Sequence, residues 1–154
     1  MSNAFSYFQE LEALKTLNEE QCKAFLDLLV FATLADGKIT EIELNQFDEE
    51  LMRLPFLWDD EIRDRVIEHS ANTRDTLEEQ ITDHDYVNTF IDDLATRIVT
   101  NEHRELGLRM FVAIVISDGM NELERNCCIR VADAFGRPKD EVDKLAQDLV
   151  DTFV

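Results

Sequence analysis

The sequence predicts an all-α fold: one duplicated helical bundle of about seven to eight helices with two apolar helices at its centre. Glycine and proline, which interrupt helices, are rare, with 4 Gly and 2 Pro in 154 residues. Most segments between them repeat apolar residues at spacings of three and four, which is the period of an amphipathic helix. Capping signatures recur at the starts of these segments. We therefore treat residues 1–154 as a single domain with internal halves of about 1–72 and 83–154.

Two helices are predicted at the beginning of the chain. Apolar residues at helical spacing predict the first over residues 5–16. Asn18 and Gln21 form a capping box, which starts a second helix that extends to Ala35. The second half of this helix is apolar nearly all round. Such a helix is typical of the centre of a bundle.

Two more helices are predicted before the midpoint. Thr40 and Glu43 form another capping box, and the helix that it starts ends just before Pro55, because proline disfavours helical geometry in the preceding residue. Asp59 and Asp60 start the next helix, since acidic groups stabilise the positive end of the helix dipole. Residues 71–85 are polar and weakly periodic, so we expect a connector with at most one short helix there.

The second half of the chain repeats this pattern. A single apolar stripe predicts a helix over residues 85–100, and Asn101 is expected to cap a helix over 102–117. Asn121 starts the next helix with a further capping signature, and Gly136 ends it. A last helix opens at the proline two residues later.

The two most apolar predicted helices run into the same dipeptide. Asp36 and Asp118 are each followed by Gly, then by a cap residue with Glu three positions later. The two aspartates lie 82 positions apart and the cap residues Thr40 and Asn121 lie 81 apart, close to half of the 154 residues. This internal repeat predicts a duplicated helical hairpin, with the two acidic loops at related positions.

Segments 34–43 and 116–124, followed by Ala-Phe-Gly at 134–136, resemble the tellurite-resistance TerB family. The resemblance implies an all-helical, duplicated domain of about this size. It also implies acidic residues that bind a divalent cation at the two Asp-Gly loops, and an association with stress response and tellurite resistance. A non-enzymatic cytoplasmic binding module with a protein partner is the function expected from it.

The resemblance assigns four metal ligands: Asp36, Glu43, Asp118 and Glu124. Glu124 departs from the family's usual pattern, in which Asp and Glu lie seven apart, because the second loop is one residue shorter than the first. Carboxylate oxygens are hard ligands and favour Ca²⁺, Mg²⁺ or Mn²⁺. The ordinary alternative is that each loop is a glycine turn followed by a capped helix.

A true EF-hand is excluded by the first loop. With Gly37 at loop position six, positions one and three are Ala32 and Leu34, which have no oxygen ligand in their side chains. Coordination by these loops would therefore need carboxylates from both copies.

Catalytic motifs have little support in the sequence. His69, His84 and His103 belong to no metalloprotease or di-iron spacing and fit surface or helix-end positions. Cys22, Cys127 and the adjacent Cys128 fit packing better than metal binding or a disulfide framework. A metal-dependent hydrolase that uses only carboxylates, or a purely structural interaction domain without metal, are the alternatives to the binding module.

The charge of the chain limits its partners. With 34 Asp+Glu against 15 Lys+Arg, the formal net charge is −19, which argues against binding nucleic acid or anionic lipid. The N-terminus shows no secretory signal, and no apolar run approaches the length of a membrane span, so a cytoplasmic location is expected. The identity of a protein partner stays unknown, and a homo-oligomer is left open.

Overall fold

The computed structural model describes residues 17–35, 40–52, 59–117 and 119–153. Within these ranges the chain is helical and contains no strand, which confirms the predicted all-α class. The helix predicted over residues 5–16 lies outside them. The described helices are, in chain order, α2 (Glu19–Thr33), α3 (Glu41–Met52), α4 (Asp60–Gln80), α5 (His84–Arg97), α6 (Asn101–Ile116), α7 (Glu122–Ala134) and α8 (Lys139–Phe153).

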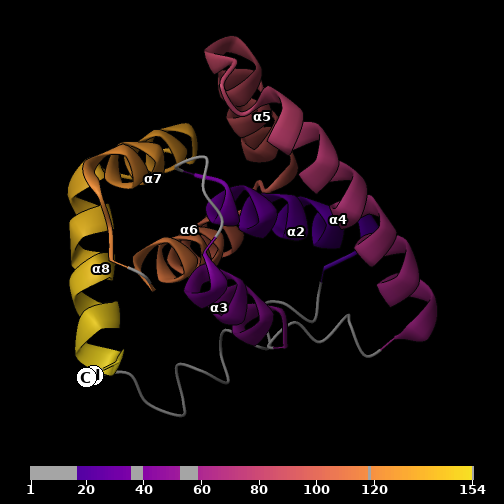
Figure 1. The fold of residues 1–154 in the computed structure, drawn as a ribbon, viewed down its shortest axis with the longest axis horizontal. Helices are drawn as coiled ribbons and strands as arrows, with labels where there is room; N and C mark the ends of the chain where they lie inside the picture. The colour runs from indigo at the N-terminus through magenta and orange to yellow at the C-terminus, as the bar shows by residue number, and fades with distance from the viewer. Residues whose placement is uncertain (1–16, 36–39, 53–58, 118, 154) are drawn as a thin grey trace.

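Helix α2 contacts four other helices. It packs against α3, α4, α5 and α6, and Figure 1 shows it between the α4–α5 pair on one side and α3 and α6 on the other. Every residue of the segment 24–33 is buried, as its apolar sequence requires. Helix α8 closes the molecule on the other side, against α6 and α7.

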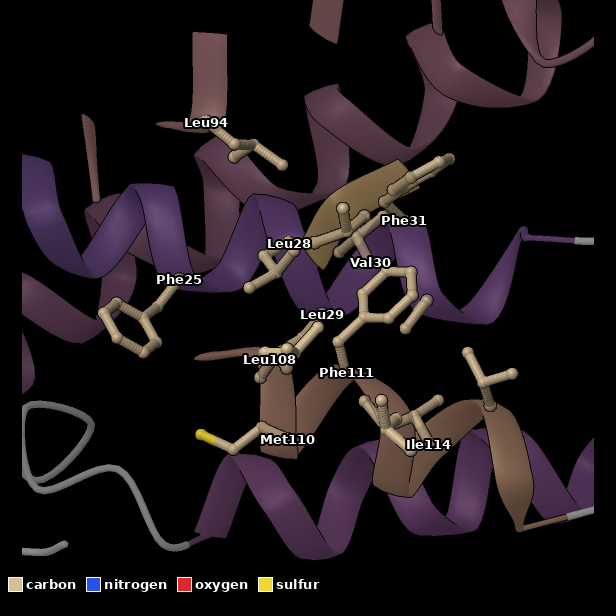
Figure 2. Close-up of a cluster of buried hydrophobic side chains, with 14 of the residues drawn as sticks. Phe25, Leu28, Leu29, Val30, Phe31, Leu94, Leu108, Met110, Phe111 and Ile114 are labelled. Carbon is tan, nitrogen blue, oxygen red and sulfur yellow. The ribbon is translucent and has the colours of Figure 1, made fainter. Parts of the chain in front are cut away.

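Helices α2 and α6 contact each other through buried apolar side chains. Figure 2 shows side chains of α2, including Phe25 and Leu29, opposite those of α6, including Leu108 and Phe111. Gly107 permits this close approach, since a Cβ atom built there would lie 3.0 Å from Leu28 Cδ2. A residue with a side chain at this position would require the Leu28 side chain to shift by a few tenths of an ångström.

Three N-caps lie where the sequence predicted them. Asn18 and Asn121 form complete capping boxes with the third residue of their helices, and Asp59 accepts hydrogen bonds from the first turn of α4. The cap of α6 is Thr100, whose hydroxyl oxygen accepts from the backbone of His103. The prediction of Asn101 as this cap was therefore wrong by one residue.

The predicted connector over residues 71–85 was also wrong. Helix α4 continues through this stretch to Gln80, and α5 begins at His84 after a turn of three residues. The two residues of α4 that are buried are Val66 and Leu77, three helical turns apart. Because so few apolar positions suffice to pack α4 on α2, its last turns carry almost no periodic signal.

Helix α7 ends in a Schellman motif. The backbone N–H of Gly136 donates to Asp133 O at 3.0 Å, and that of Arg137 donates to Ala132 O at 2.8 Å. Gly136 has a φ of 70°, which a residue with a side chain rarely adopts. The predicted end of this helix at Gly136 is thus confirmed.

No helix within the described ranges is long and apolar enough to cross a membrane.

Candidate functional site

The predicted metal ligands are only partly described. Asp36 and Asp118 lie outside the described residues. Glu43 lies in the first turn of α3, and its side chain is also outside them. The distance between the two Asp-Gly segments is therefore not established, and their convergence on one ion stays a prediction.

Glu124 is the one predicted ligand whose side chain is described. It is 4% exposed, and its Oε1 accepts from the backbone N–H of Asn121 at 3.2 Å. Asn121 Oδ1 in turn accepts from the Glu124 backbone at 2.7 Å, which completes the capping box of α7. The residue thus has a clear role as a helix cap, and its role as a ligand stays a prediction. Among the residues that the structure describes, no group of three or more His, Cys, Asp or Glu could hold a metal ion.

A cavity of about 420 Å³ lies between the end of α2, the start of α5 and the first half of α7. This volume is within the usual range for small-ligand sites. The apolar part of its wall consists of Phe31, Ala35, Ile81, Val87, Ile91 and Leu123. The polar part consists of Thr82, His84, Asn88, Asn126 and Arg130, and the Cys127 thiol completes the lining.

The cavity is lined by one residue next to the first acidic segment and by one residue within the second. Ala35 directly precedes Asp36, and Leu123 directly precedes Glu124 in the second segment. Both Ala35 and Leu123 line the cavity, so the end of α2 and the start of α7 lie on the same wall. The fold therefore brings together two segments of the chain that are distant in the sequence.

The thiols are protonated core groups rather than nucleophiles. Burial raises the pKa of Cys127 to about 12, and the negative charge of Glu124 adds to this effect. Burial also raises the pKa of Cys22 to about 12 and that of Cys128 well above its ordinary value. Since the thiolate is the reactive form, such cysteines are inert at neutral pH. The prediction of packing roles is confirmed for Cys22 and Cys128, which are buried in the core.

Asp27 forms a buried polar cluster that the sequence analysis missed. It lies in the apolar part of α2 and is 2% exposed. Its Oδ1 accepts from Thr73 Oγ1 at 2.7 Å, and its Oδ2 lies 2.9 Å from both His69 Nε2 and Arg97 Nη1. An ionised carboxylate only accepts, so His69 Nε2 is the donor in its contact. The cluster links α2 to α4 and α5.

The geometry of this cluster fits a structural role and does not fit activation of the Thr73 hydroxyl as a nucleophile. In a hydroxyl–imidazole–carboxylate triad, one ring nitrogen faces the carboxylate and the other faces the hydroxyl. Here Thr73 Oγ1 lies 3.5 Å from the same His69 Nε2 that faces Asp27. The hydroxyl therefore donates to the carboxylate and is not activated by the ring.

The expected surface or helix-end position needs correction for His69 alone, which lies half-buried in the middle of α4. His84 begins α5 and is exposed, as predicted. His103 lies at a helix end as predicted, in the first turn of α6, where it is buried in an edge contact with Phe25 at 6.0 Å between ring centres. The sequence signal for the Asp27 cluster was one acidic residue within the otherwise apolar segment 24–32 of α2.

Comparison of the chain with known protein families, with curated proteins and with solved structures gives no match. The resemblance to the TerB family thus continues to depend on the two Asp-Gly segments and the Ala-Phe-Gly that follows the second of them.

Proposed function

We propose that this protein is a non-enzymatic binding module of the tellurite-resistance type that holds a divalent cation at its two Asp-Gly segments. In this proposal the chain is a duplicated helical bundle with α2 and α6 at its centre. The ligands are Asp36, Glu43, Asp118 and Glu124, and the ion is Ca²⁺, Mg²⁺ or Mn²⁺. The module acts in the cytoplasm and binds a protein partner in a stress response.

The observation that carries the proposal is the shared cavity wall. Ala35 and Leu123, which border the first and second acidic segments, line the same cavity. Two acidic segments held near one another repel each other, and a bound cation relieves that repulsion. At an ion concentration one hundred times the dissociation constant, binding would add about 2.7 kcal/mol to the free energy of unfolding.

Thermal melts with and without added ions test this proposal. The parent protein is measured with Ca²⁺, Mg²⁺, Mn²⁺ and Zn²⁺ at constant ionic strength, together with the double variant Asp36→Asn, Asp118→Asn. We expect one of the oxygen-preferring ions to raise the melting temperature of the parent and not that of the variant.

A matched control separates site binding from general charge effects. The double variant Asp75→Asn, Asp133→Asn makes the same change in net charge at exposed positions on α4 and α7. It should retain the ion response of the parent. If the parent shows no ion-dependent rise, or if the control loses the response equally, the chain is an interaction domain without a metal site. Metal-dependent turnover of ester or phosphoester substrates that is lost in the Asp36, Asp118 variant would indicate a hydrolase instead.

A further inference from the structure

The cavity between α2, α5 and α7 differs in charge from the rest of the molecule. The chain contains 34 acidic residues among 154, yet none of the twelve cavity-lining residues is Asp or Glu. The lining groups that can ionise are the Arg130 guanidinium, the His84 imidazole and the Cys127 thiol. Among the residues that the structure describes, the wall therefore offers no carboxylate to a cation, and the one permanently charged group in it is positive.

The guanidinium of Arg130 is held in place from one side. Its Nε donates to Asn88 Oδ1 at 2.9 Å, and its Nη2 donates to Asp92 Oδ1 at 2.8 Å. Nη2 also lies 3.5 Å from Asn88 O. Nη1 takes part in none of these contacts. The group is thus oriented by neighbours and retains donor capacity, which suits recognition of an anionic oxygen.

Three described acidic residues close to the cavity are not part of its lining. Asp83 and Asp85 flank His84 in the sequence, and Asp83 caps α5 through the backbone of Tyr86. Asp92 pairs with Arg130 but is not part of the lining. These carboxylates reduce the positive potential at the cavity without offering a ligand to a cation. The thiol of Cys127, whose pKa is raised to about 12, contributes no negative charge at neutral pH.

We propose that this cavity binds a small amphipathic carboxylate, with its alkyl or aryl part against the apolar wall and its carboxylate on Arg130. Phe31, Val87, Ile91 and Leu123 supply the apolar wall. The cavity volume of about 420 Å³ lies in the lower half of the range of small-ligand sites, which suits a small ligand such as octanoate. This inference is independent of the cation site and goes beyond the proposed function.

Titration with octanoate tests the charge and the apolar requirement together. Binding is followed by the ¹⁵N–¹H spectrum of the full chain at about 0.15 M salt, where the Debye length of about 8 Å screens the overall negative charge. Octanol and octylamine, with the same chain and a different head group, are titrated in parallel. We expect octanoate to shift the amide signals of the cavity-lining residues and to bind about tenfold more tightly than either of the others.

Two arginine variants on one helix provide a matched comparison. Arg130→Gln removes the cation from the cavity, whereas Arg125→Gln removes an exposed cation of α7 that pairs with Asp143 and does not line the cavity. We expect Arg130→Gln to weaken octanoate binding about tenfold and to leave octanol binding unchanged, and Arg125→Gln to change neither. Absence of octanoate binding to the parent, or equal octanoate affinities of the two variants, would overturn the proposal. Changes of amide signals only at residues remote from the cavity would also overturn it.

A cavity-filling variant locates the apolar part of the ligand. Val87 lines the cavity from α5, and Val87→Phe places additional volume there. We expect it to abolish octanoate binding while the circular dichroism spectrum stays that of the parent. If this variant does not fold, the amide shifts in the parent protein still decide where octanoate binds. Absence of an ion-dependent rise in the melting temperature of the parent would overturn the cation proposal and leave these octanoate results unaffected, so the two proposals fail separately.

Discussion

Asp27 has the most unusual environment of the described acidic residues, since it lies within an apolar helix and accepts hydrogen bonds from two other helices. The Asp27→Asn variant keeps the size of the side chain but removes the buried counterion of Arg97, which then pairs only with the exposed Asp93 on its own helix. Removal of one partner from a buried ion pair costs about 3–5 kcal/mol. Because the amide retains some of the hydrogen bonds, we expect the free energy of unfolding in urea to fall by about 3 kcal/mol.

Asp75 provides the control for this variant, because it is exposed on α4. Asp75→Asn makes the same chemical change, and we expect it to alter the free energy of unfolding by less than about 0.5 kcal/mol. Equal effects of the two substitutions would show that the cluster at Asp27 does not contribute to stability.

The thiols lead to a prediction on alkaline pH. Cys22 and Cys127 have a pKa of about 12 in the folded protein, above the ordinary thiol value of about 8.5. As the pH rises through the ordinary value, the unfolded chain releases these protons first, so the equilibrium shifts toward unfolding. The stabilising effect of the protonated thiols is therefore complete below about pH 8 and decreases as the pH rises toward 12. Urea melts between pH 8 and 10 should show a smaller loss of stability for Cys22→Ala than for the parent.

Labelling with a thiol reagent gives a second measurement of the same property. A pKa near 12 leaves on the order of a thousandfold less thiolate at pH 8 than an ordinary thiol has. We expect all three cysteines to react quickly in urea and slowly in the folded protein. Fast labelling of Cys22 under native conditions would contradict the burial described for it.

At the scale of single helices, two adjacent residues at the start of α6 differ in their capping role. Thr100 accepts the hydrogen bond from His103 N at 3.2 Å, whereas Asn101 is the first residue of the helix and is exposed. Loss of a cap side chain costs about 1 kcal/mol. We expect Thr100→Ala to lower the free energy of unfolding by about this amount and Asn101→Ala to change it by less than about 0.5 kcal/mol. The reverse order in urea melts would restore Asn101 as the cap.

The helices were predictable where local chemistry determines them. Asn18, Asp59 and Asn121 satisfy backbone groups within three residues, so their sequence signatures contain all the relevant information. The end of α7 at Gly136 is equally local. The last turns of α4 were missed because this helix packs through only a few apolar positions, and a polar stretch gives no periodic signal.

The described part of the candidate site was much less predictable. Asp27 pairs with residues 42 to 70 positions away, and no local pattern reveals such contacts. The cavity likewise depends on the approach of α2, α5 and α7. The sequence indicated the acidic repeat, but the side-chain oxygens of Asp36, Glu43 and Asp118 lie outside the described residues, so their geometry stays a prediction.

For the whole molecule, the net charge of −19 predicts a dependence of stability on salt. Repulsion among like charges destabilises the compact state, and salt screens it. Cross-helix pairs such as Arg65–Glu19 and Arg125–Asp143 act in the opposite direction, but exposed pairs contribute little. We therefore expect the melting temperature to rise when NaCl increases from about 0.02 to about 0.5 M, as the Debye length falls from about 20 to about 4 Å. A fall would mean that the ion pairs outweigh the repulsion.

The cluster at Asp27 also restricts how α4 and α5 can align along α2. An apolar helix such as α2 offers similar surfaces at successive turns, so a neighbouring helix displaced by one turn would still cover it. Such a slip in register would separate the carboxylate of Asp27 from Arg97 and leave this carboxylate in an apolar environment, whereas Arg97 would keep its pair with Asp93 on the same helix. We infer that this single acidic residue selects one alignment of α4 and α5 along α2, and that its apolar replacements would yield a helical protein with more than one packing.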